Sequence, residues 1–216
     1  MYVQTFKVSS LFMQNQCYLI HDLKNGILID PAWDYTLINN FLTENNITLN
    51  GILLTHSHID HTNLADKFAI NHNIPVYIGK KEAEFFQFTC NNLQFVSHLD
   101  NINLGSFTIQ SMLTPGHTIG SVCFLIENHL FSGDTVFIEG VGGCYDKSSN
   151  PENLYYSIQY LKNYLPSTTL FWPGHNYGVE PGKDLSYLMK NNIYFQFDTI
   201  DQFVSFRMRK NQVITF

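Results

Sequence analysis

Three histidines and an aspartate fall within the segment "LLTHSHIDHTNL", directly after a short apolar run. In chain order they are His56, His58, Asp60 and His61. Imidazole nitrogens and carboxylate oxygens are ligands that proteins commonly offer to divalent transition metals. Neither a hydrophobic core nor a solvated surface explains such a concentration of histidine. The segment therefore predicts part of a metal site.

Three further segments repeat the pattern of an apolar run that ends in a turn carrying His or Asp. They are "LTPGHTIG", "LFSGDTVF" and "LFWPGHNYG", and they supply His117, Asp134 and His175. Together with the first segment, they offer enough nitrogen and oxygen donors for two adjacent divalent ions. None of these donors is a cysteine, which disfavours a purely structural zinc site.

The donors divide into two sets joined by one carboxylate. We predict a first set of His56, His58 and His117, and a second set of Asp60, His61 and His175. Asp134 is the natural bridge, because its two oxygens can each bind one ion. Two metals about 3.5–4 Å apart can hold a hydroxide and polarise a neighbouring carbonyl group.

The elements that position these donors are strands, since each donor segment begins with an apolar run. Strands are expected at "YVQTFKV", "CYLI", "GILIDPA", "GILLT", "VYIG", "FTIQSMLT", "SVCFLI", "HLFSGD" and "TLFW". Helical spacing of Leu37, Phe41 and Leu42 predicts a helix between the third and fourth of these strands, and "HTNLADKFAINH" predicts another. Residues 151–165 predict a helix that buries one face, made of Leu154, Ile158, Leu161 and Leu165. We expect an α/β (α+β) fold of two mixed sheets covered by helices on the outside.

Composition and charge argue against several classes of protein. The 216 residues carry a net charge of -6 without a run of Lys or Arg, which argues against nucleic acid or an anionic membrane as partner. No apolar stretch is long enough to span a membrane, and the N-terminus lacks a signal-peptide layout. The four cysteines are far apart, which fits reduced thiols in a cytoplasm. A single domain over residues 1–216 is expected, with a short helical extension from about 181 that forms two helices around "IYFQF".

"THSHIDH" resembles the T-H-x-H-x-D-H signature of the metallo-β-lactamase-fold hydrolases, and "PGHT", "SGDT" and "PGH" follow in the order that this family shows. The resemblance covers residues from about 2 to 180. It implies an αββα sandwich with a dinuclear site at one edge between the sheets. The ligand set above carries over to it residue by residue, with zinc as the expected metal and iron or manganese as alternatives.

Several segments of the sequence resemble a narrower branch of this family. Asp134 as bridging ligand looks like the glyoxalase II-like enzymes, which cleave thioesters. "IDPAWDY", "GDTVFIEG" and "NIYFQF" most resemble the zinc-dependent hydrolases of bacterial trans-acyltransferase polyketide pathways, of the bacillaene type. This resemblance implies a cytoplasmic enzyme of antibiotic biosynthesis that releases acyl groups from an acyl carrier protein. Asp134 and Asp60 are the predicted catalytic carboxylates, with Asp60 orienting the nucleophile.

Substrate contacts are predicted at Tyr145 and in the tail. Glutathione thioesterases of this branch carry a basic residue two positions before a tyrosine, whereas this chain has Gly143 before Tyr145. Arg207, Arg209 and Lys210 resemble the basic motif at the end of that family, although a solvated helix end is an equally good interpretation. A hydroxyacylglutathione hydrolase is therefore the alternative function.

Two further alternative functions are a different class of enzyme and a protein without enzymatic activity. An iron-dependent sulfur dioxygenase would use a smaller ligand set, and a degenerate carrier-binding protein would have lost ligands that this chain retains. Two residues near the motifs have more than one interpretation as well. Asp30 either supports the site through a hydrogen bond or begins a turn before Pro31, and Cys144 is expected to be a buried or loop thiol and not a nucleophile.

Overall fold

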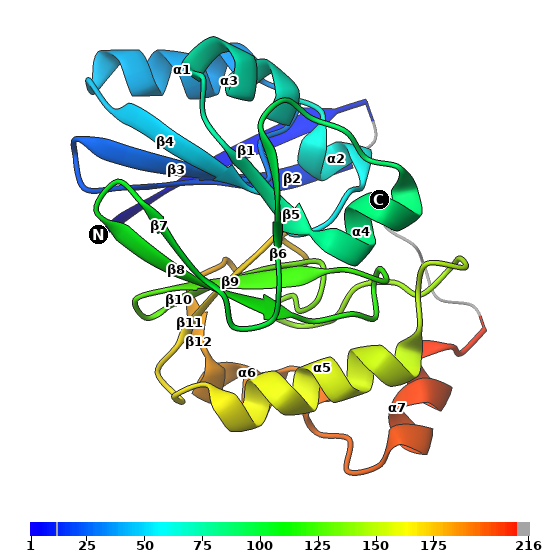
Figure 1. The fold of residues 1–216 in the computed structure, drawn as a ribbon. Helices are drawn as coiled ribbons and strands as arrows, with labels where there is room; N and C mark the ends of the chain where they lie inside the picture. Colours follow the sequence, from blue (N-terminus) through cyan, green and yellow to red (C-terminus); the bar gives the residue numbers. More distant parts are fainter. Residues whose placement is uncertain (12, 211–216) are drawn as a thin grey trace.

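The computed structural model describes residues 1–11 and 13–210, and these residues form two six-stranded sheets packed face to face (Figure 1). The first sheet has the order β1 (Tyr2–Ser10), β2 (Met13–His21), β3 (Asn25–Ile29), β4 (Thr48–Leu53), β5 (Val76–Gly79), β6 (Leu93–Val96). The second has the order β12 (Lys183–Asp184), β11 (Leu170–Pro173), β10 (His129–Gly133), β9 (Val122–Ile126), β8 (Phe107–Leu113), β7 (Asn101–Leu104). Both sheets contain parallel and antiparallel pairs, as the sequence predicts.

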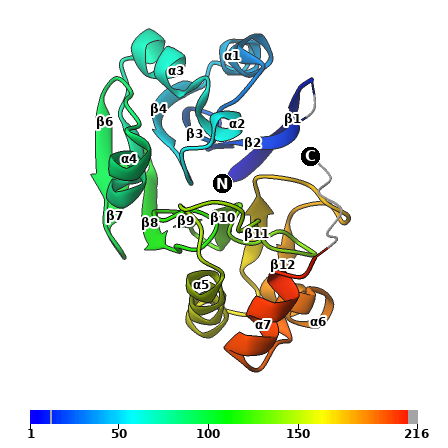
Figure 2. The same cartoon turned by 90° about the vertical axis from the view of Figure 1, so that its right-hand side faces the viewer.

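Helices cover the outer faces, so that the layers run helix, sheet, sheet, helix (Figures 1 and 2). The helices that follow strands of the first sheet are α1 (Tyr35–Glu44), α2 (Ile59–Thr62), α3 (Ala65–His72) and α4 (Lys80–Phe86). Those of the second half are α5 (Pro151–Tyr164), α6 (Leu185–Asn191), the 3-10 turn η1 (Ile193–Phe195) and α7 (Ile200–Arg207). The predicted αββα sandwich is confirmed.

Three buried clusters hold the layers together. One lies between the first sheet and its helices and includes Phe68, and another lies between the sheets and includes Phe124 and Phe131. The third joins the second sheet to α5 and the tail helices and includes Phe203. The predicted face of α5 is confirmed, since its four apolar residues are all buried: Leu154, Ile158, Leu161 and Leu165. Burial of apolar area on both faces of each sheet is the main stabilising contribution.

Strand ends gather the donor segments at one edge of the sandwich. Parallel pairing of β3 with β4 and of β10 with β11 places their carboxyl ends together. The two sheets meet there through backbone bonds: Val122 N donates to Thr55 O, and Gln16 N donates to Gly174 O. Ligand sites in such folds form at the carboxyl ends of strands.

Two of the predicted helices differ in detail from the sequence prediction. The helix expected from "HTNLADKFAINH" is split, and the one-turn helix α2 carries Asp60 and His61 before α3 begins at Ala65. On α1 the buried stripe is formed by Ile38 and Leu42, while Leu37 is exposed. The two predicted tail helices are present as α6 and α7, and residues 211–216 lie outside the described part of the chain.

Among the described residues, no helix combines the length and apolar character needed to cross a bilayer.

Candidate metal centre

The first predicted donor set converges on one point. His56 Nε2 lies 3.0 Å from His58 Nδ1, and His117 Nε2 lies 3.2 Å from the same His58 atom. His56 and His58 follow β4, whereas His117 lies in the loop between β8 and β9. The fold therefore assembles three imidazoles from two loops of different sheets.

The second donor set is equally compact. His175 Nε2 lies 3.4 Å from Asp60 Oδ2, and His61 Nε2 lies 3.6 Å from the same oxygen. Asp134 stands between the sets, with Oδ1 at 3.5 Å from His61 Nε2 and Oδ2 at 3.6 Å from His117 Nε2. Its Oδ2 is also 3.4 Å from His175 Nε2. This is the position expected of a bridging carboxylate.

Hydrogen bonds behind the imidazoles decide which nitrogen of each ring faces the centre. His117 Nδ1 lies 2.8 Å from Gly143 O, and His175 Nδ1 lies 2.7 Å from Gln14 O. A carbonyl oxygen can only accept, so both Nδ1 atoms must donate. Each Nε2 is therefore the atom left to bind a metal, an orientation that is typical of metal-bound histidine.

Asp30 orients two more imidazole rings, that of His61 directly and that of His56 through the Thr55 hydroxyl. It accepts from His61 Nδ1 at 2.9 Å and from the Thr55 hydroxyl at 2.6 Å. Because that hydroxyl donates to Asp30, its oxygen is free to accept from His56 Nδ1, which lies 3.1 Å away. Asp30 also accepts from the Thr55 backbone N–H. Both of its oxygens thus accept hydrogen bonds, so Asp30 supports the site through these bonds and lies close to His56 and His61.

The donor set fits a pair of divalent ions. Two nitrogens bound to one tetrahedral zinc at about 2.0–2.1 Å lie roughly 3.3 Å apart, close to the spacings found here. His61 Nε2 and Asp134 Oδ1 are buried and have no hydrogen-bond partner within the described residues. Buried polar atoms without partners are costly, and a cation would satisfy both. Each set is also a recognisable His/Asp cluster: His56, His58 and His117; Asp60, His61 and His175.

Charge in the metal-free centre is unevenly distributed. Burial and the neighbouring imidazoles lower the pKa values of His56 and His58, so these rings are neutral ligands at pH 7. Burial also acts to lower the pKa of His175, but Asp134 and Asp60 outweigh it and raise that pKa to about 12. Burial likewise opposes the charge of Asp134, yet His175 and His61 hold its pKa well below the ordinary value. The metal-free centre therefore holds a proton on His175 where a metal would bind.

Metal binding is accordingly expected to release protons and to strengthen as pH rises. The raised pKa of His175 means that its Nε2 proton stays bound through the neutral range, so the ion that binds the second set must displace it. Apparent affinity should increase by up to about tenfold per pH unit for each proton displaced. Zinc titration calorimetry in buffers of different ionisation enthalpy measures the protons released. Affinity that does not change between pH 6 and 8 would contradict this account of the centre.

A cavity of about 560 Å³ opens directly over the centre. His58, Asp60, His117, Asp134 and His175 form part of its wall. The remainder is largely apolar or aromatic and includes residues beyond the predicted site residues: Met13, Ile59, Phe137, Val141, Tyr177 and Tyr194. Tyr177 stacks on the His175 ring, with ring centroids 5.4 Å apart. Such a pocket suits a substrate with an apolar part beside the reacting group.

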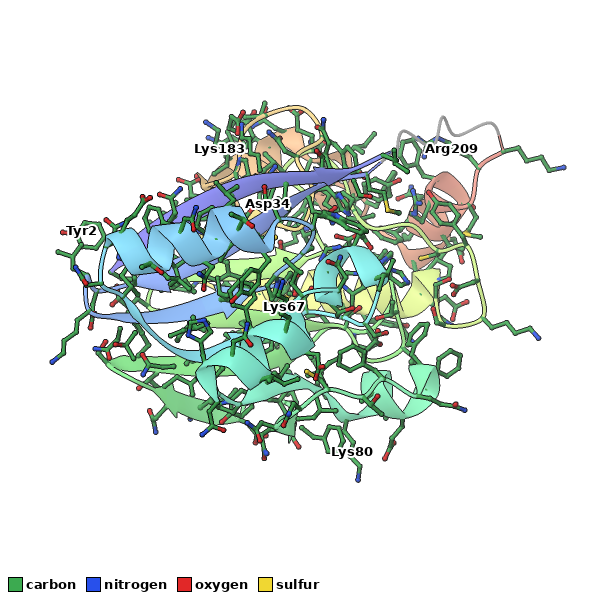
Figure 3. The ribbon with its side chains drawn as sticks, turned by 90° about the horizontal axis from the view of Figure 1, so that it is seen from above. Tyr2, Asp34, Lys67, Lys80, Lys183 and Arg209 are labelled. Carbon is green, nitrogen blue, oxygen red and sulfur yellow. The ribbon has the colours of Figure 1, made fainter. Side chains whose placement is uncertain are left out.

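The predicted substrate-binding residues are only partly at this cavity. Tyr145, Arg207 and Arg209 line it, whereas Lys210 is exposed and does not. Arg207 is buried and donates to the hydroxyl groups of Tyr145 at 2.8 Å and Tyr194 at 3.2 Å. Arg209 is exposed at the end of the molecule opposite Tyr2 (Figure 3).

The Tyr145 ring lies over Gly143. A Cβ atom at residue 143 would come within 1.8 Å of the ring carbon Cε2 of Tyr145. A basic side chain at this position would therefore require Tyr145 to move away from Arg207. Cys144, between them, is buried, and burial raises the pKa of its thiol to about 11, which disfavours a nucleophilic role at neutral pH.

Two further residues that support the site have no motif in the sequence. Asn15 Nδ2 donates to Asp60 Oδ2 at 2.9 Å, and Asn15 Oδ1 accepts from the Trp33 indole. Glu82 is fully buried and accepts hydrogen bonds from Ser57 and Gly120. Neither residue lies in a donor segment, and only the fold brings them to the site.

Known proteins resemble the chain over almost its whole length. Residues 11–89 match the Metallo-beta-lactamase superfamily. The chain is 43% identical to the "Probable polyketide biosynthesis zinc-dependent hydrolase BaeB" of Bacillus velezensis, over 97% of this chain and 94% of that protein. It is 42% identical to the protein described in the same words and named PksB, from Bacillus subtilis, over 92% of this chain and 89% of the relative. Among solved structures, that of ETHE1 from Myxococcus xanthus has a TM-score of 0.87 at 25% identity and covers 100% of this chain and 93% of the other.

Proposed function

Because the chain belongs to the metallo-β-lactamase superfamily, we propose that it is a zinc-dependent hydrolase that cleaves thioesters at a dinuclear centre. The observation that carries this proposal is the position of Asp134, whose oxygens lie between His61, His175 and His117. A site for one ion would need only one of the two donor sets. Here both sets are complete and are joined by one buried carboxylate.

The proposed chemistry follows from these donors. Two bound ions would supply a hydroxide nucleophile at neutral pH and a Lewis acid for the carbonyl oxygen. Asp60 and Asp134 project from the cavity wall beside the imidazole nitrogens, so both can orient the attacking oxygen. A thiolate is a good leaving group and needs little protonation, so no separate general acid is required. The apolar part of the cavity would hold the acyl chain.

We further propose an acyl group carried by an acyl carrier protein, in polyketide biosynthesis, as the substrate. Two near full-length relatives are described as polyketide biosynthesis hydrolases, which supports this pathway. The cavity supports it as well, since it combines an apolar wall with Gly143 at the position where glutathione thioesterases of this branch carry a basic residue.

A side-by-side hydrolysis assay tests the substrate. We expect metal-loaded protein to cleave an acylated carrier protein with a kcat/KM that is roughly ten- to a hundredfold higher than for S-lactoylglutathione. The factor corresponds to one missing charged hydrogen bond to glutathione, worth about 1.5–3 kcal/mol. Mass spectrometry follows both substrates. A preference for the glutathione thioester would instead identify a hydroxyacylglutathione hydrolase.

Metal content distinguishes the proposed hydrolase from the other enzyme class, the sulfur dioxygenases. An iron-dependent sulfur dioxygenase would use a smaller ligand set, whereas the second set is complete in this chain: Asp60, His61 and His175. Purified protein that holds a single iron and consumes oxygen in the presence of a persulfide would overturn the hydrolase proposal.

A further inference from the structure

Glu82 joins the two loops that carry the first donor set. Its Oε1 accepts from the Ser57 backbone N–H at 2.9 Å and from the Ser57 hydroxyl at 2.8 Å. Its Oε2 accepts from the Gly120 backbone N–H at 2.9 Å. Ser57 lies between His56 and His58, and Gly120 lies in the loop that carries His117. The Glu82 side chain thus forms hydrogen bonds to both loops that supply ligands of the first set.

The carboxyl group is completely enclosed. Glu82 has 0% exposure, although it is in the first turn of α4, where a Glu is ordinarily in water. Burying a carboxylate is costly unless its oxygens are hydrogen-bonded, and here three donors do so. A buried, fully bonded carboxylate of this kind fixes its partners in place.

The packing around Glu82 leaves little room for the loops to shift. A Cβ atom at Gly120 would come within 2.2 Å of the Glu82 backbone nitrogen. One at Gly79 would come within 2.3 Å of the Gly120 carbonyl oxygen. The loop that carries His117 therefore lies directly on the start of α4, and the glycines permit this close approach.

We propose that Glu82 is a positioning residue that sets the separation between His117 and the His56–His58 pair. The proposal rests on the metal centre described above. Glu82 contacts no ligand itself and acts through Ser57 and Gly120. Its role differs from that of Asp30, which bonds to the His61 ring directly. Asp60 and His61 of the second set also follow Ser57, but only the first set draws ligands from both loops that Glu82 joins. The first set should therefore depend on Glu82 more than the second does.

Glu82→Gln tests this proposal, and Glu84→Gln on the same helix is its matched control. Gln has the shape of Glu but only one acceptor oxygen, so either the Ser57 or the Gly120 bonds are lost. Glu84 is exposed and pairs only loosely with Lys80, at 3.8 Å. In a His175→Ala background, which weakens the second set, cobalt titration of the metal-free protein reports on the first set. We expect Glu82→Gln to raise its Kd about 10–100-fold and Glu84→Gln to leave it unchanged.

Two further measurements exclude a merely structural effect. In a His117→Ala background, which weakens the first set, Glu82→Gln should raise the Kd of the second set by a clearly smaller factor. The visible absorption of cobalt at saturation should also change in Glu82→Gln, because the geometry of the first set changes. Equal losses at both sets, or an unchanged spectrum with unchanged affinity, would overturn the proposal.

Ser57→Ala is a second variant that tests the proposal if Glu82→Gln does not fold. This variant removes only the hydroxyl donor and leaves the two backbone donors in place. It should show a smaller loss of affinity at the first set, and unchanged affinity would contradict the proposal. None of these titrations uses a thioester, so they remain decisive even if the protein proves to act on another substrate.

Discussion

Replacing Asp134 with Ala is expected to lower thioester hydrolysis roughly 10³-fold and to leave only one tightly bound metal ion per chain. The carboxylate has oxygens within 3.6 Å of Nε2 atoms of both sets, at His117 in the first set and at His61 and His175 in the second. Without it, neither ion keeps its shared ligand, and the imidazoles of His61 and His175 lose the negative charge that they face. Metal content and initial rates measure the two effects.

Asp201→Ala is the control for this substitution. Asp201 is exposed in the first turn of α7 and does not line the cavity. Its removal should leave two metal ions and the full rate. Wild-type turnover in the Asp134 variant would refute the assignment of the bridge.

Gly174→Ala is expected to reduce turnover about 10²-fold while the protein stays folded. A Cβ at residue 174 would lie 2.4 Å from His61 Cε1 and 2.7 Å from Asp134 Oδ1. The backbone cannot move away easily, because Gly174 N donates to Gly133 O and Gly174 O accepts from Gln16 N. The added methyl group must therefore displace His61 or Asp134, and a misplacement near 1 Å can cost about 10²-fold in rate.

Gly140→Ala is the corresponding control, because it adds the same methyl group to the cavity wall at a place where a Cβ would meet nothing nearer than 3.7 Å. The circular dichroism spectrum should be the same for both variants, whereas rate and zinc affinity should fall only in Gly174→Ala. Equal rates in the two variants would show that the centre tolerates the displacement.

The donor segments could be predicted from the sequence because each is local. "THSHIDH" places four donors within one loop and one helical turn, and strand exits are recognisable from apolar runs that end in turns. The αββα architecture follows from the same runs together with the amphipathic helix α5. These features depend on residues that are close in the chain.

The supporting contacts could not be predicted, since they join residues far apart in the chain. Asp30 had two equal interpretations until the fold placed it 2.9 Å from the His61 ring. Glu82 looks like an ordinary exposed residue in "GKKEAEFF", and its burial depends on loops 25 and 38 residues away. The contact of Tyr145 with Gly143 depends on the tail, because Arg207 holds the tyrosine hydroxyl.

Whether the centre is a dinuclear thioesterase can be measured as release of thiol from an acyl-pantetheine thioester while metal-free protein is titrated with zinc. We expect the rate to rise until two equivalents of zinc are bound per chain and then to stay constant. The same titration of Asp134→Ala should give almost no thiol. A plateau at one equivalent, or no thiol release at any zinc concentration, would contradict a dinuclear thioesterase.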